Sequence, residues 1–106
     1  MLSGYRLVWL IVLFDLPVST KKERKRASTF RANLVNMGFE MVQFSVYMKF
    51  GYGKDQAETI IQNVKKEVPE YGNVKILRIT DKQFSQIIHL GNQLPIRKQN
   101  EQLALF

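Results

Sequence analysis

The stretch VWLIVLFDLP, residues 8–17, decides the fold of this chain. Its apolar side chains run without a break to Phe14, which predicts a strand buried on both faces in the middle of a sheet. The run is too short to cross a bilayer, so we expect no membrane partner. Pro17 ends the strand because proline has no N–H to donate to the ladder. The strand therefore carries one carboxylate, Asp15, to the rim of the sheet.

The composition of the whole chain indicates one small, basic, globular domain. The chain has 106 residues, 45% of them hydrophobic, and a formal net charge of +7. A domain this small and this basic usually binds a polyanion such as a nucleic acid. Cysteine is absent, which excludes disulfides and thiolate metal sites and fits a cytoplasmic location. We expect the domain to cover residues 1–91 and a polar tail to cover residues 92–106.

Two amphipathic helices are expected on either side of a β segment. The first begins after Thr20, which has capping-box spacing to Glu23, and it ends before Gly38. Its buried stripe consists of Ala27, Phe30, Leu34 and Met37. The stripe of the second helix consists of Ala57, Ile60, Ile61, Val64 and Val68. Both stripes predict packing against the same sheet.

The β segment between the helices, residues 39–50, alternates between apolar and polar side chains. The apolar set is Val42, Phe44, Val46, Met48 and Phe50, and the polar set is Gln43, Ser45, Tyr47 and Lys49. We expect the apolar set to face the core, and the polar set to face either solvent or a dimer partner. Because the segment is long for one strand, we expect a bend or two short strands.

Further strands are predicted over residues 74–80 and 86–90, with a turn between them. The order of elements is then strand, helix, two strands, helix, strand, followed by the additional strand at the C-terminal end. This order is typical of an α+β, ferredoxin-like βαββαβ sandwich with an extra C-terminal strand.

Several kinds of active site are excluded by the motifs that the chain lacks. It contains no Walker loop, no dinucleotide-binding fingerprint and no serine-hydrolase elbow. It has a single histidine, His89, so a histidine-rich zinc site cannot form within one chain.

Asp15 is the strongest candidate for a catalytic and metal-binding residue. A carboxylate suits a hard cation such as Mg²⁺, which can activate water and stabilise charge on a phosphate. One carboxylate holds Mg²⁺ poorly, and Glu23 is expected to be used by the helix cap. A homodimer would solve this by bringing two copies of Asp15 together across a two-fold axis. The alternative is that Asp15 only forms the turn at the end of the strand.

A cationic segment, KKERKR at residues 21–26, follows the strand. The residues expected to bind nucleic acid are Lys21, Lys22, Arg24, Lys25, Arg26 and, further along the helix, Arg31. On a helical wheel Arg24 and Arg31 lie at nearly the same angle beside the buried stripe, and Lys21 and Lys25 are next to them. Lys22 and Arg26 are expected to face elsewhere. Arginine pairs with phosphate through its planar fork, so the contacts would not depend on base sequence. The alternative is a solvated cationic face that only aids solubility.

Four segments in combination resemble the small CRISPR-associated Cas2 proteins. They are the strand ending in VLFDLP, the basic helix, QFSVY at residues 43–47 and VKILRITDKQF at residues 74–84. The FDLP and TDKQF segments are most similar to members that accompany the Cas9 effector. The resemblance runs from about residue 7 to residue 90.

The resemblance implies a ferredoxin-like homodimer in which Asp15 of both subunits lies near the dimer axis and binds a divalent cation. It implies a metal-dependent endonuclease that acts on RNA or double-stranded DNA. It also implies a scaffold for the duplex in the spacer-acquisition complex, between dimers of the CRISPR integrase, Cas1. Two alternatives stay open: a nucleic-acid-binding scaffold without catalysis, and a toxin-like ribonuclease on the same fold.

The resemblance also assigns roles to individual positions. Ser45 and Tyr47 match the S-V-[YF] motif of the second β segment, and Gln43 begins the same segment as a motif or dimer position. Arg24 and Arg31 stand where family arginines flank the first strand. The tail after the last strand is expected to cross to the partner subunit or to dock on the integrase.

Overall fold

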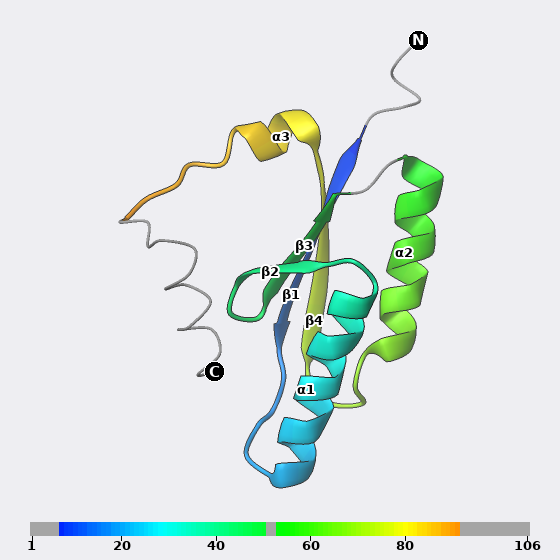
Figure 1. The fold of residues 1–106 in the computed structure, drawn as a ribbon, viewed down its shortest axis with the longest axis vertical. Helices are drawn as coiled ribbons and strands as arrows, with labels where there is room; N and C mark the ends of the chain where they lie inside the picture. The colour runs from blue at the N-terminus through cyan, green and yellow to red at the C-terminus, as the bar shows by residue number, and fades with distance from the viewer. Residues whose placement is uncertain (1–6, 51–52, 92–106) are drawn as a thin grey trace.

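The computed structural model describes residues 7–50 and 53–91. Its central feature is one antiparallel sheet of four strands. The strands are β1 (Val8–Asp15), β2 (Glu40–Gln43), β3 (Val46–Phe50) and β4 (Asn73–Thr80). They are ordered β2-β3-β1-β4, so β1 is a central strand, as its apolar run predicted. The helices are α1 (Lys21–Asn36), α2 (Lys54–Glu67) and the short α3 (Asp81–Ser85), as Figure 1 shows.

The order of elements confirms the α+β, ferredoxin-like class. The expected division of residues 39–50 into two short strands is also confirmed. The expected strand over residues 86–90 is wrong, because these residues have no regular secondary structure. A capping box starts α3 instead of a turn: the Gln83 amide donates to Thr80 Oγ1, and the Thr80 amide donates to Gln83 Oε1. The tail, residues 92–106, lies outside the described residues, so its expected role stays a prediction.

Helix α1 begins and ends where the sequence predicted. The Glu23 amide donates to Thr20 Oγ1 at 3.0 Å, and the Thr20 amide donates to Glu23 Oε1 at 2.8 Å. Gly38 follows the helix with φ of +94°, a conformation that side chains disfavour. The Glu23 carboxylate is therefore used in the cap, as expected.

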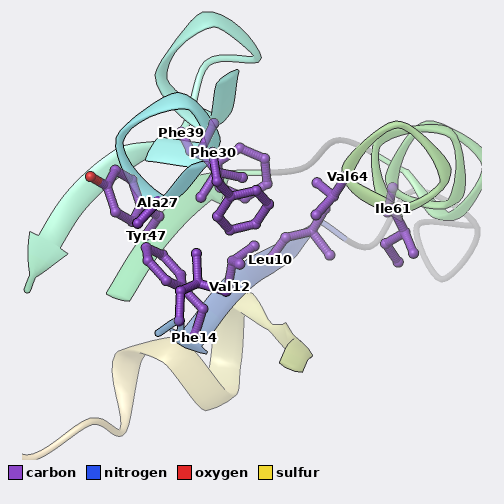
Figure 2. Packing of buried hydrophobic residues seen from close by; sticks show 12 residues of the cluster. Leu10, Val12, Phe14, Ala27, Phe30, Phe39, Tyr47, Ile61 and Val64 are labelled. Atoms are coloured by element: carbon purple, nitrogen blue, oxygen red, sulfur yellow. The ribbon is translucent and has the colours of Figure 1, made fainter. Parts of the chain in front are cut away.

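The core lies between the sheet and the two long helices (Figure 2). Leu10, Val12 and Phe14 of β1 point into it and are almost fully buried. They belong to one cluster with Phe30 of α1 and Val64 of α2. The Phe14 and Phe30 rings meet edge to face with their centroids 5.1 Å apart. Burying each such side chain contributes about 1.5–3 kcal/mol to stability, which holds the end of β1 firmly in place.

The expected orientation of β3 is wrong, and strand register gives the reason. Val12 of β1 pairs with Tyr47 of β3, so Tyr47 faces the core and is only 2% exposed. The neighbouring residues of β3 then lie on the opposite face. Before β3, Val42 and Phe44 are each 47% exposed. The alternating pattern was correct as a strand signal, but its apolar side does not face the helices.

The side of the sheet away from α1 and α2, which we call the open face, is largely apolar. By register and alternation it carries the apolar residues Trp9, Ile11, Leu13, Val46, Met48, Phe50, Leu77 and Ile79. The same register places the exposed polar residues Lys75 and Asn73 on it, next to the end of β1. Leu77 is 50% exposed on it. Helix α3 packs at one end of this face. The Phe84 and Trp9 rings stack there with their centroids 3.8 Å apart, and Trp9 Nε1 donates a hydrogen bond to Asp81 Oδ1. In the described part of the chain, no helix is long and apolar enough to span a bilayer.

Gly72 precedes β4 and packs against the end of β1. Its φ is +131°, and a Cβ there would overlap Leu16 Cδ2 and stand 3.5 Å from the Asp15 carbonyl oxygen. We expect Gly72→Ala to lower the free energy of unfolding by about 1–3 kcal/mol, as measured by urea denaturation. Gly53→Ser is the control, because Gly53 has open space around it and is the N-cap of α2, a position that favours serine. Equal stability of the Gly72→Ala protein would contradict this prediction.

Candidate active site

A hollow of about 380 Å³ lies at the rim of β1, between α1 and the turn that joins β2 to β3. We call it the Asp15 hollow. Its lining residues are Asp15, Leu16, Val18, Arg24, Ser28, Arg31, Phe44 and Ser45. The structure thus brings together four of the residues predicted from the sequence: Asp15, Arg24, Arg31 and Ser45. It adds Ser28 and Phe44, which sequence reasoning did not single out.

Asp15 is the last residue of β1, and its side chain is exposed. By alternation along β1 it lies on the same side as Leu13, the side of the open face. Within the described residues its carboxylate makes no hydrogen bond and no ion pair. The carboxylate therefore has no partner among these residues, and Asp15 is one of the residues that line the hollow.

Arg31 approaches the hollow from α1 and is held by aromatic rings. Its Cζ atom is 4.9 Å from the centroid of the Phe44 ring and 5.7 Å from that of Phe14. Its Nε atom is buried and has no hydrogen-bond partner among the described residues. Burial raises the pKa of the nearby Tyr47 hydroxyl above its usual value, and the Arg31 charge partly opposes this. Tyr47 is therefore neutral at physiological pH.

Arg24 has a different task from Arg31. Its Nη1 atom donates to the carbonyl oxygens of Val18 at 3.1 Å and Ser19 at 3.2 Å. These bonds tie the loop between β1 and α1 to the helix. A guanidinium has five N–H donors, so Arg24 still has donors that can reach a ligand.

Ser45 shapes the turn on the other side of the hollow. Its φ is +63°, the left-handed region that residues other than glycine rarely adopt. Its carbonyl oxygen accepts a hydrogen bond from the Phe14 amide at 3.1 Å. This bond fastens the turn, and with it Phe44, to β1. Of the other motif positions, Gln43 is exposed on β2 and Tyr47 lies in the core, so neither lines the hollow.

The remaining basic residues of α1 lie elsewhere. A groove of about 500 Å³ between α1 and the end of α2 is lined by Lys22, Lys25, Arg26, Thr29, Phe30, Asn33, Glu67, Pro69 and Glu70. Lys25 is therefore in this α1–α2 groove and not beside Arg24 and Arg31, which corrects the helical-wheel prediction. Lys21 is exposed at the first turn of α1 and lines neither hollow. The packing of α1 thus divides one basic segment between two surfaces.

The two residues that were missed had no clear signal in the sequence. Phe44 belonged to an alternating apolar set that predicted a place in the core. Ser28 is one of many polar residues on the exposed side of a helix. Only the turn geometry at Ser45 and the packing of α1 show that both line the Asp15 hollow.

The oxygen ligands around the hollow suit a metal ion that also takes ligands from outside this protomer. No group of three or more His, Cys, Asp or Glu residues that could hold a metal ion occurs among the residues described. Asp15 is the sole carboxylate among the residues lining the hollow, which also include Ser28 and Ser45. Mg²⁺ commonly takes one or two carboxylates and completes its shell with water and phosphate oxygens. These residues therefore fit a cation completed by a phosphate or a second Asp15, and not a self-contained metal site.

Comparison with known proteins gives the family. Residues 8–87 match the family described as "CRISPR associated protein Cas2". The chain is 45% identical to "CRISPR-associated endoribonuclease Cas2" of Paracidovorax avenae, with the full length of both covered. It is 41% identical to the protein of the same name from Flavobacterium psychrophilum, over 99% of this chain and 93% of the relative.

A solved structure agrees with the fold. The protein titled "Crystal structure of cas2" matches with a TM-score of 0.57 and 21% identity, over 85% of this chain and 94% of the other. At this identity the likeness bears on the fold alone. The family match over residues 8–87 and the full-length relatives, together with the resemblance of four separate segments, lead to one conclusion: the chain belongs to the CRISPR-associated Cas2 family.

Proposed function

We propose that this protein is a divalent-metal-dependent endonuclease of a CRISPR system and that the Asp15 hollow holds the phosphodiester. One observation carries the proposal. Asp15 and Arg31 line the same hollow, yet they are not ion-paired with each other. A phosphodiester between them would find an oxygen ligand for its cation on one side and a cationic donor on the other. The names of the P. avenae and F. psychrophilum relatives, both endoribonucleases, agree with this chemistry.

Each residue of the hollow has a task in this proposal. Asp15 would hold the divalent cation, which when bound activates water and neutralises charge on the phosphate. Arg31 binds a non-bridging phosphate oxygen and orients the phosphorus atom. The Ser28 and Ser45 hydroxyls would donate hydrogen bonds to the same phosphate. Arg24 holds the loop between β1 and α1 through its hydrogen bonds to Val18 and Ser19, and this fixes one wall of the hollow.

The proposed working unit is a homodimer joined through the open face. That face is largely apolar, and Leu77 is half exposed on it in the single chain. Apolar patches of this kind are typical of interaction surfaces. Because Asp15 lies on the same side of β1, a two-fold axis through the open faces would bring two Asp15 carboxylates to one interface. This would supply the second carboxylate that a single protomer does not offer to a cation.

A second function, as a scaffold for duplex DNA between integrase (Cas1) dimers, is favoured by the α1–α2 groove. Lys22, Lys25 and Arg26 line it away from Asp15, so they can bind phosphates without taking part in cleavage. The net charge of +7 agrees with binding to a duplex backbone.

The groove makes a quantitative prediction for duplex binding. Replacing Lys22, Lys25 and Arg26 together by glutamine is expected to weaken duplex binding. The slope of the logarithm of the binding constant against the logarithm of the salt concentration should become shallower by up to about 3. Fluorescence anisotropy between low and moderate salt measures both effects. The matched control replaces three exposed α2 lysines, Lys54, Lys65 and Lys66. An equal change in the control would show that net charge alone acts and that the groove is not a specific surface.

The nuclease proposal is tested with single-stranded RNA and duplex DNA as separate substrates. We expect the purified protein to cleave at least one of them with Mg²⁺, to lose this activity in EDTA, and to regain it when Mg²⁺ is restored. Cleavage that persists in EDTA would contradict metal dependence. Binding without any cleavage would favour the non-catalytic scaffold, and RNA cleavage without binding to the integrase would favour the toxin-like alternative.

A further inference from the structure

The Arg31 guanidinium rests on two rings that differ in their surroundings. Phe14 is 7% exposed and belongs to the core cluster. Phe44 is 47% exposed and lies in the turn between β2 and β3, on the wall of the Asp15 hollow. The guanidinium is nearer to Phe44, at 4.9 Å against 5.7 Å for Phe14. Core packing therefore accounts for Phe14 but does not account for Phe44.

The polar contacts of Arg31 do not explain its position either. Its Nε atom is buried without a hydrogen-bond partner, and the guanidinium forms no ion pair among the residues described. A buried donor without a partner lowers stability, so native proteins seldom keep one without a reason. The aromatic faces are then what holds this cation, since a cation over a ring is attracted by the electron density of the ring face.

The turn that carries Phe44 is itself fastened to the strand that carries Asp15. Ser45 adopts its φ of +63° and accepts the Phe14 amide through its carbonyl oxygen. Phe44 and Asp15 are therefore held to the same stretch of β1. A guanidinium stacked on Phe44 stays at a set place relative to the carboxylate.

We propose that Phe44 is a positioning residue, whose ring holds the Arg31 guanidinium so that its terminal nitrogens meet a nucleic-acid phosphate in the Asp15 hollow. Because Nε is buried, the phosphate is gripped end-on through Nη1 and Nη2. The inference deepens the proposed function and rests on it for the identity of the ligand. In this proposal Phe44 contacts the Arg31 guanidinium but touches neither the divalent metal ion nor the reacting atoms.

The ring, and not merely the bulk, is required. Leucine at position 44 keeps an apolar side chain of similar reach but has no ring face, whereas tyrosine keeps the ring face. Phe44→Leu is therefore the test variant, and Phe44→Tyr is the variant expected to rescue it. Tyr71→Leu is the matched control, because Tyr71 is an exposed aromatic residue, 64% exposed, that does not line the Asp15 hollow.

A first experiment reads the position of Arg31 without any substrate. In a ¹⁵N-labelled protein the Arg31 Nε–H should give a separate, slowly exchanging NMR signal, because the atom is buried near two rings. Phe44→Leu should shift this signal and speed its exchange with water, and Phe44→Tyr should leave both nearly unchanged. An unaltered Arg31 signal in Phe44→Leu would overturn the inference. This result does not depend on whether the protein is a nuclease.

A second experiment is a double-mutant cycle with a short fluorescent single-stranded RNA as the probe. We expect Phe44→Leu to weaken binding about fivefold. In an Arg31→Gln background the same change should have no further effect, since residues that act through one another are not additive. Tyr71→Leu should bind as the unaltered protein does. Thermal unfolding of each variant confirms that it is folded.

The outcomes separate the inference from the function on which it rests. If Arg31→Gln weakens binding and Phe44→Leu does not, or if the two effects simply add, the positioning role is overturned and the proposed site stands. If Arg31→Gln leaves RNA binding unchanged, the phosphate site in the hollow is overturned, and the role of Phe44 in binding with it.

Discussion

Replacing Asp15 by asparagine is expected to abolish metal-dependent cleavage, with a loss of about a hundredfold or more. Asparagine keeps the size of the side chain and removes its charge, so the cation loses its anionic ligand. In the proposed homodimer both carboxylates are lost at once. The measurement is the rate of cleavage at saturating substrate over a range of Mg²⁺ concentrations.

The same variant should keep the fold and keep its affinity for nucleic acid. Asp15 is exposed, and its carboxylate makes no hydrogen bond among the residues described, so its replacement costs little stability. Removing a negative charge from the hollow should leave binding to a phosphate equal or slightly tighter. Asp55→Asn is the matched control, because Asp55 is an exposed carboxylate on α2 outside the hollow.

Two results would contradict the role of Asp15. Undiminished cleavage by Asp15→Asn would show that another residue holds the cation. A loss of cleavage that comes with a loss of RNA and duplex binding would show that Asp15 supports the structure of the hollow and not the chemistry.

Replacing Leu77 by lysine is expected to convert the proposed homodimer to a monomer, raising the dimer dissociation constant about a hundredfold or more. Leu77 is half exposed in the single chain, so the monomer tolerates a lysine there. In a two-fold interface the change occurs twice, and each buried unpaired charge is costly. Light scattering coupled to size-exclusion chromatography measures the oligomeric state. Cleavage should fall with the dimer if the two Asp15 carboxylates share a cation.

Val35→Lys is the control for the change at Leu77. Val35 is an apolar residue of similar exposure, 55%, but it lies on α1, on the other side of the sheet. Val35→Lys adds the same charge as Leu77→Lys. Because position 35 lies outside the proposed interface, this change should leave the dimer intact. A Leu77→Lys protein that stays dimeric, or an unaltered protein that is already monomeric, would refute an interface on the open face.

The framework of the fold could be predicted from local signals. The apolar run of β1, the capping box of Thr20 and Glu23, and the glycine after α1 each act within a few residues of sequence. The strand at residues 86–90 was predicted in the same way and is absent. A strand needs a neighbouring ladder as well as apolar residues, and the pattern alone does not supply the neighbour.

The candidate site could be predicted only in part. Asp15 was recognisable because a lone acid at the end of a buried strand is unusual. Phe44 and Lys25 were misplaced, because alternation and helical angle show which residues share a face but not what that face meets.

By itself the sequence determined the class of fold, the basic character of the chain and the carboxylate at the rim of β1. They depend on composition, on spacing along single elements and on the order in which those elements follow one another. The tertiary structure decided which side of β3 enters the core, that Lys25 lines the α1–α2 groove and not the Asp15 hollow, and which ring holds Arg31. These features depend on the register between strands and on the packing of a helix across a sheet, which join residues far apart in the chain.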